Sequence, residues 1–101
     1  MLIEYSISIS LDEACLEIGV EQEQVYAIVE HGIIAPDSGH GDNWTFDLDM
    51  ICRAKRAIRL QRELHLDWSA VALLVSLLDE RDRLRTDNDQ LRSQLTKLTS
   101  H

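Results

Sequence analysis

The chain has 101 residues, 45% of them hydrophobic, and a formal net charge of −8, which fits one modest folded domain. No apolar run approaches the ~20 residues that span a bilayer, so we expect no membrane partner. The N-terminus has neither a positively charged region nor a small-residue cleavage site, so we expect no secretory signal peptide and a cytoplasmic location.

The first predicted elements are a strand over residues 3–9 and a short helix. Apolar and polar side chains alternate along these residues, which is the pattern of a half-buried strand. Ser10 is placed to cap the helix, and Glu13 completes a capping box. Gly19 is predicted to end the helix, because glycine adopts the left-handed conformation at little cost. The helix should bury a stripe made of Leu11, Ala14, Cys15 and Ile18.

A second helix is predicted near residues 21–31, ended by Gly32, with Val25, Ile28 and Val29 on its inner face. Two short helices joined by a glycine turn are typical of a helix-turn-helix. Residues 33–36 then predict a short strand, residues 37–43 a loop and residues 44–46 a returning strand. These segments would form a hairpin, the wing of a winged helix-turn-helix, with which the first strand could pair.

A third helix is predicted to begin at Asp47 or Asp49 and to run to about residue 64, with its core-facing residues at Ile51, Ala54, Ile58 and Leu64. Asp67 is placed to cap a fourth helix that continues to about residue 98. Leu66 before this cap and Val71 after it form a hydrophobic staple. The predicted fold is therefore mainly α, with a winged helix-turn-helix domain over residues 1–66 and a long dimerisation helix over residues 67–101.

The last helix changes character along its length. Residues 71–78 are nearly all apolar and should be covered on several sides. Beyond them the apolar pattern narrows to a heptad repeat, with Arg81 and Asn88 at two a positions. Such a strip predicts a coiled-coil homodimer, although the helix could instead fold back over its own domain. Alternating charges at the flanking positions favour a parallel pair. The predicted dimerisation residues are Leu77, Leu84, Asn88, Leu91, Leu95 and Leu98.

The charge is divided unevenly along the chain. Residues 1–50 contain eleven acidic residues and no lysine or arginine, whereas residues 51–101 contain seven acidic and ten basic residues. Nucleic-acid affinity depends on lysine and arginine at phosphates, so we expect no direct nucleic-acid binding. An acidic surface instead suits a basic protein partner. The third helix carries the main basic stretch, which could contact phosphate or form internal ion pairs with the acidic residues of positions 1–50. This stretch consists of Arg53, Lys55, Arg56, Arg59 and Arg62.

No residue pattern predicts an enzyme. The four histidines are scattered, and Gly39 and Gly41 lack the lysine and helix of a phosphate-binding loop. Cys15 and Cys52 have no metal-ligand spacing and are predicted to be reduced core thiols. We therefore expect no catalytic residue, no metal and no cofactor, and interpret Trp44 and Trp68 as core or interface anchors.

At this point the chain resembles the bacterial chaperone modulator proteins (CbpM), whose fold is similar to the MerR-type winged helix. The resemblance covers essentially the whole length and is sharpest in residues 44–47 (WTFD), 56–60 (RAIRL) and 63–68 (ELHLDW). It implies a protein that binds the J-domain of a DnaJ-like, curved-DNA-binding co-chaperone. It further implies that this binding inhibits the co-chaperone and DNA-binding activities by competition with Hsp70. The alternatives are a MerR-like DNA-binding transcription regulator and a dimerisation adaptor for another basic protein.

The resemblance supplies no contact residues, so the partner-binding hypothesis rests on charge alone. Glu21, Glu23 and Glu30 are expected to face solvent on the second helix and to meet the basic helix of the J-domain. Arg56 and Arg59 of the third helix are the competing candidates, which would bind acidic residues of the same partner.

Overall fold

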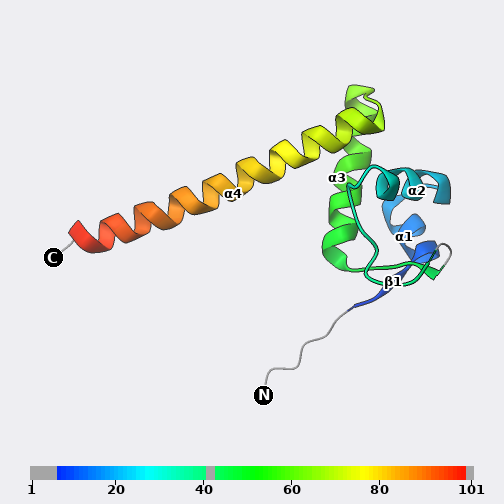
Figure 1. The fold of residues 1–101 in the computed structure, drawn as a ribbon, viewed down its shortest axis with the longest axis horizontal. Coiled ribbons are helices and arrows are strands. Elements are labelled where there is room, and N and C mark those ends of the chain that lie inside the picture. Colours follow the sequence, from blue (N-terminus) through cyan, green and yellow to red (C-terminus); the bar gives the residue numbers. More distant parts are fainter. Residues whose placement is uncertain (1–6, 41–42, 100–101) are drawn as a thin grey trace, which may run out of the picture.

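Four helices and a very small sheet make up the fold of the computed structural model, which describes residues 7–40 and 43–99. The elements are β1 (Ile9–Ser10), α1 (Leu11–Ile18), α2 (Gln22–Glu30), β2 (Thr45–Phe46), α3 (Leu48–Leu64) and α4 (Trp68–Thr99). Figure 1 shows α4 starting beside α3 and then projecting far beyond the other helices. The mainly α fold class with a long C-terminal helix is confirmed.

Local capping bonds fix where the helices begin and end. Ser10 Oγ accepts a hydrogen bond from the Glu13 backbone N–H at 3.2 Å, at the start of α1. Asp47 Oδ1 accepts from a backbone N–H three residues later at 2.8 Å, and Asp67 Oδ1 does the same at 2.9 Å. Gly19 ends α1 with φ 82°. Asp47, rather than Asp49, is therefore the cap of α3, and the predicted limits of all four helices are confirmed.

The first predicted strand, over residues 3–9, is described by the structure only at its end. β1 contains only Ile9 and Ser10, which pair antiparallel with Phe46 and Thr45 of β2. Residues 3–6 of the predicted strand lie outside the described residues, while Ile7 precedes β1 and is 53% exposed. Among the described residues of the predicted strand, pairing thus begins at Ile9.

The predicted strand at residues 33–36 is wrong. Ile33 and Ile34 are buried, but their backbone is irregular. The predicted hairpin is replaced by a single antiparallel bridge between Ser38 and Thr45, next to the β1–β2 pair. A short apolar run does not distinguish a buried strand from a buried loop, which is the reason for the error.

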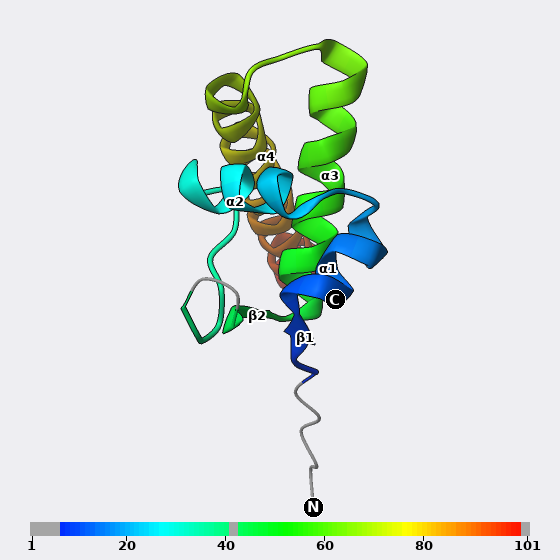
Figure 2. The same ribbon diagram turned by 90° about the vertical axis from the view of Figure 1, so that its right-hand side faces the viewer.

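The core lies between α1, α2, α3 and the first turns of α4. Phe46 of β2 is fully buried at its centre, and Val71 and Val75 bring α4 into it. Figure 2 shows α4 receding behind α2 and α3 after this contact. The buried apolar residues among those described are Leu11, Ala14, Val25, Ile28, Ile33, Ile34, Phe46, Ile51, Ala54, Ala57, Ile58, Val71 and Val75.

Two core predictions need correction. Leu64 is 52% exposed, because it lies in the last turn of α3 next to the solvent-exposed connection to α4. Cys52 is also exposed, whereas Cys15 is half-buried against the core. Burial raises the pKa of the Cys15 thiol, with a smaller contribution from the Asp12 carboxylate. Both cysteines are free thiols, but only Cys15 belongs to the core.

Candidate protein-interaction surfaces

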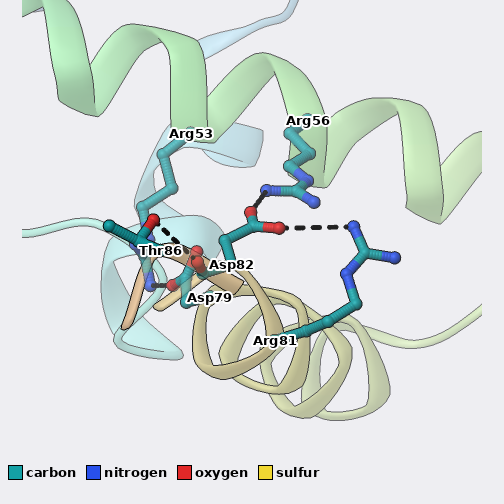
Figure 3. A network of polar contacts seen from close by, with 6 residues as sticks. All are labelled: Arg53, Arg56, Asp79, Arg81, Asp82 and Thr86. Atoms are coloured by element: carbon teal, nitrogen blue, oxygen red, sulfur yellow. Dashed lines mark hydrogen bonds and ion pairs between the residues drawn. The ribbon is translucent and has the colours of Figure 1, made fainter. Parts of the chain in front are cut away.

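One side of α3 is bound to α4 by ion pairs. Arg53 pairs with Asp79, and Arg56 lies 3.5 Å from the carboxylate of Asp82, so both arginines point from α3 toward α4 (Figure 3). Arg53 Nε also donates a hydrogen bond to the Ile33 carbonyl at 2.6 Å. Arg53 therefore joins α3, α4 and the segment after α2, and helps to set the direction in which α4 leaves the core.

The spacing of the charged residues on α3 and α4 is a sequence signal for these ion pairs. The two arginines are three residues apart on α3, and the two aspartates are three residues apart on α4, so each pair lies on one helical face. Sequence reasoning missed the match because nothing local indicates that the two faces meet. Arg56, a candidate for partner contact, is consequently engaged within the chain.

The opposite side of α3 faces α1. Lys55 Nζ lies 2.9 Å from a Glu17 carboxylate oxygen. This hydrogen bond, and to a lesser degree the charge of Lys55, lowers the pKa of Glu17. Arg62 donates to the Gly19 carbonyl at 3.4 Å, while Arg59 makes no hydrogen bond or ion pair to any part of the chain that the structure describes. Lys55 therefore forms an internal ion pair with the acidic N-terminal half of the chain, which is one of the two roles expected for the cations of α3.

The acidic face of α2 consists of Glu21, Glu23 and Glu30. All three are exposed. Glu23 and Glu30, seven residues apart, lie on the side of α2 away from the buried Val25 and Ile28, whereas Glu21 precedes the first turn. Their predicted orientation toward solvent is confirmed. Glu21 is the residue at which α2 begins, and its backbone N–H donates to a side-chain oxygen three residues later at 3.3 Å. The Glu21 side chain also belongs to the capping box at the start of α2, so its substitution would alter that box.

A row of exposed leucines runs along α4 and is called here the leucine seam. We use this name for Leu77, Leu84, Leu91, Leu95 and Leu98, whose exposed fractions lie between 55% and 73%. The prediction that residues 71–78 are covered on several sides is wrong for the single chain, since Leu73 is 63% exposed. A protruding helix that exposes a leucine strip of this length presents a surface suited to a second helix.

Other kinds of site find no support among the described residues. No group of three histidine, cysteine, aspartate or glutamate side chains there lies close enough to hold a metal ion. Within the same residues, no helix is both long and apolar enough to cross a membrane. Trp44 and Trp68 pack against the core, and the ring of Trp44 contacts Tyr26 edge-on with centroids 5.2 Å apart.

Comparison with known proteins shows which family has this architecture. The family model described as MerR HTH family regulatory protein matches residues 9–93. The chaperone modulatory protein CbpM of Salmonella arizonae is 38% identical over 95% of both chains, and that of Citrobacter koseri is 35% identical over 99% of both. The chain belongs to the CbpM family. The MerR-like fold class and the resemblance to chaperone modulators are thereby confirmed.

Proposed function

We propose that this protein modulates a chaperone system by binding the J-domain of a DnaJ-like, curved-DNA-binding co-chaperone. Binding inhibits the co-chaperone and DNA-binding activities because the protein competes with Hsp70 for the J-domain. Membership of the CbpM family supports the chaperone-modulating role. We choose the acidic face of α2 as the contact surface for the J-domain, because its exposed carboxylates complement a basic helix.

We further propose that the active form is a homodimer joined along the leucine seam, with residues 1–66 free to bind the partner. In a parallel coiled coil the acidic g positions Glu80 and Asp87 meet the basic e positions Arg85 and Arg92 of the other chain. Asp87, Arg85 and Arg92 make no ion pair within the described residues of their own chain, so they are available for such contacts.

Binding kinetics on an immobilised J-domain test the acidic face. The double variant Glu23→Lys/Glu30→Lys leaves the helix start at Glu21 intact and replaces attraction by repulsion. It should associate at least several-fold more slowly than wild type, with an altered salt dependence. The matched control Asp49→Lys/Asp89→Lys changes the net charge equally, at exposed positions on α3 and α4. Equal slowing by both variants would show that overall charge, not this face, governs binding.

The competing candidates on α3 are tested in the same assay. Arg59→Glu is the informative change, because Arg59 has no ion pair to lose within the described chain. Arg56→Glu would place a carboxylate beside Asp82 and so disturb the α3–α4 contact as well. Full binding by the α2 variant combined with lost binding by a folded Arg59→Glu variant would move the main contact to α3.

A MerR-like DNA-binding regulator is the alternative function, and the charges of α2 disfavour it. Helix α2 occupies the position of a recognition helix, yet it presents carboxylates that repel phosphate. A gel-shift assay with duplex DNA should therefore show no complex at physiological salt. A complex whose affinity falls steeply with rising salt would indicate several phosphate contacts and would favour the alternative.

A further inference from the structure

Helix α3 presents a row of cations on the side away from α4. Three cations, Lys55, Arg59 and Arg62, are spaced by four and three residues and therefore share one face. At 1.5 Å per residue this face extends ~10 Å along the helix. With α1 it forms an open groove lined by Ile18, Lys55, Ile58, Arg59, Arg62 and Glu63.

The groove has an excess of positive charge. Glu63 is the acidic residue in its lining, and Lys55 is partly neutralised by Glu17 at 2.9 Å. Arg62 makes one long hydrogen bond to a backbone carbonyl, and Arg59 has no hydrogen-bond or ion-pair partner in the described residues. Two guanidinium groups therefore remain able to bind carboxylates, which they can grip through two parallel hydrogen bonds.

The apolar lining indicates a protein ligand rather than DNA. Ile18 and Ile58 both line the groove, so it offers aliphatic atoms beside its cations. A peptide with carboxylates next to an aliphatic side chain can use both features, whereas a phosphate backbone would use only the cations. A duplex in the groove would also approach the carboxylates of Glu17 and Glu63.

We infer that this groove binds an acidic segment of a partner protein, with an aliphatic side chain of that segment seated between Ile18 and Ile58. The hydrogen bond from Arg62 to Gly19 places one end of the groove beside the turn that leads to the acidic face of α2. One partner surface carrying both a basic helix and an acidic segment can therefore contact both regions. For the identity of the partner, the J-domain, this inference rests on the proposed function.

A labelled peptide tests the groove without assuming that partner. The probe is a fluorescein-labelled peptide in which glutamate alternates with leucine, and the measurement is fluorescence anisotropy with the full chain. Arg59→Glu/Arg62→Glu should weaken binding at least tenfold, whereas Arg59→Lys/Arg62→Lys keeps the charge and should retain most of the affinity. Arg83→Glu/Lys97→Glu, which changes the charge equally on α4, should bind like wild type. If loss of the Gly19 bond unfolds the first variant, Arg59→Glu alone should still weaken binding several-fold.

The outcomes separate this inference from the proposed function. Failure of the peptide to bind wild type, or equal binding to the glutamate variant, would overturn the groove assignment. Groove-dependent capture of a DNA duplex in place of the peptide would assign the cations to phosphate and would also overturn it. A J-domain that binds wild type and the glutamate variant equally would remove the groove from this interface while leaving the proposed function intact. A J-domain that does not bind wild type, while the peptide binds in a groove-dependent manner, would refute the proposed function and support an acidic protein ligand.

Discussion

Single polar residues determine where each helix of this small domain begins. Asp47 is the clearest case, because the partly buried acceptor that caps α3 lies directly after strand β2. The cap joins the sheet to the helix whose residues Ile51, Ala54 and Ile58 supply much of the core. A weakened cap would therefore affect both the helix and the packing around Phe46.

Removal of this cap should cost measurable stability. Asp47→Ala is expected to lower the free energy of unfolding by ~1 kcal/mol, because a helix N–H loses its acceptor. Asp49→Ala is the matched control, since Asp49 lies exposed in the first turn of the same helix and accepts no capping bond. Chemical denaturation of both variants checks the prediction, and an equal loss in the two would contradict the assigned cap.

The Glu17–Lys55 pair predicts a pH dependence of known sign. Because the pKa of Glu17 is lowered in the folded state from its usual value of 4.5, its stabilising effect is present above that value. The effect is lost as the pH falls through the lower, folded-state pKa. Lys55→Ala should raise the pKa of Glu17 toward the usual value, as followed by NMR titration of the side-chain carboxyl. An unchanged titration of Glu17 would show that the ion pair does not form in solution.

At the scale of whole elements, α4 combines two roles along one helix. Its first turns are buried through Val71 and Val75, and the pairs Arg53–Asp79 and Arg56–Asp82 hold its next turns against α3. From there on every described residue is exposed, and leucines recur at heptad spacing. Figure 1 shows this part of α4 projecting beyond the other helices.

Charge introduced into the seam should prevent dimerisation. Leu84→Glu/Leu91→Glu places carboxylates at two d positions, where a coiled coil would bury them facing each other, and should give monomers. Thr86→Glu/Ser93→Glu adds the same charge at f positions on the outer face and should leave the dimer intact. Light scattering measures the mass of each. An unchanged mass for the leucine variant, or a monomeric wild type at high concentration, would refute the coiled-coil homodimer.

The elements differ in how far their sequence determines them. Helix limits followed from local signals such as Ser10, Gly19 and Asp67, and the structure confirms them. The strand at residues 33–36 was wrong because strand formation depends on a distant pairing partner, which the apolar run does not specify. The role of Arg53 was also hidden, since its partners lie 20 and 26 residues away along the chain. Exposed acidic residues were predictable, but the groove between α1 and α3 required the packing of two helices.

At the scale of the whole molecule, two oppositely charged surfaces lie on either side of one turn. The acidic face of α2 begins just after that turn, and the basic groove of α1 and α3 ends at Gly19 within it. A partner that presents both signs of charge would be oriented as well as attracted. Such complementarity raises the association rate and the specificity of binding more than it raises the affinity. Individual exposed pairs contribute only ~0.2–1 kcal/mol, so binding should depend on several of them together.

The most direct test of the proposed function is inhibition of Hsp70 ATP hydrolysis stimulated by the J-domain co-chaperone. Added protein should reduce the stimulated rate toward the basal rate, and an excess of Hsp70 should restore it, because the two compete for one surface. Glu23→Lys/Glu30→Lys should require a much higher concentration for the same effect, unlike Asp49→Lys/Asp89→Lys. Stimulation that persists when the protein is present in large excess, or inhibition that excess Hsp70 does not relieve, would contradict competition at the J-domain.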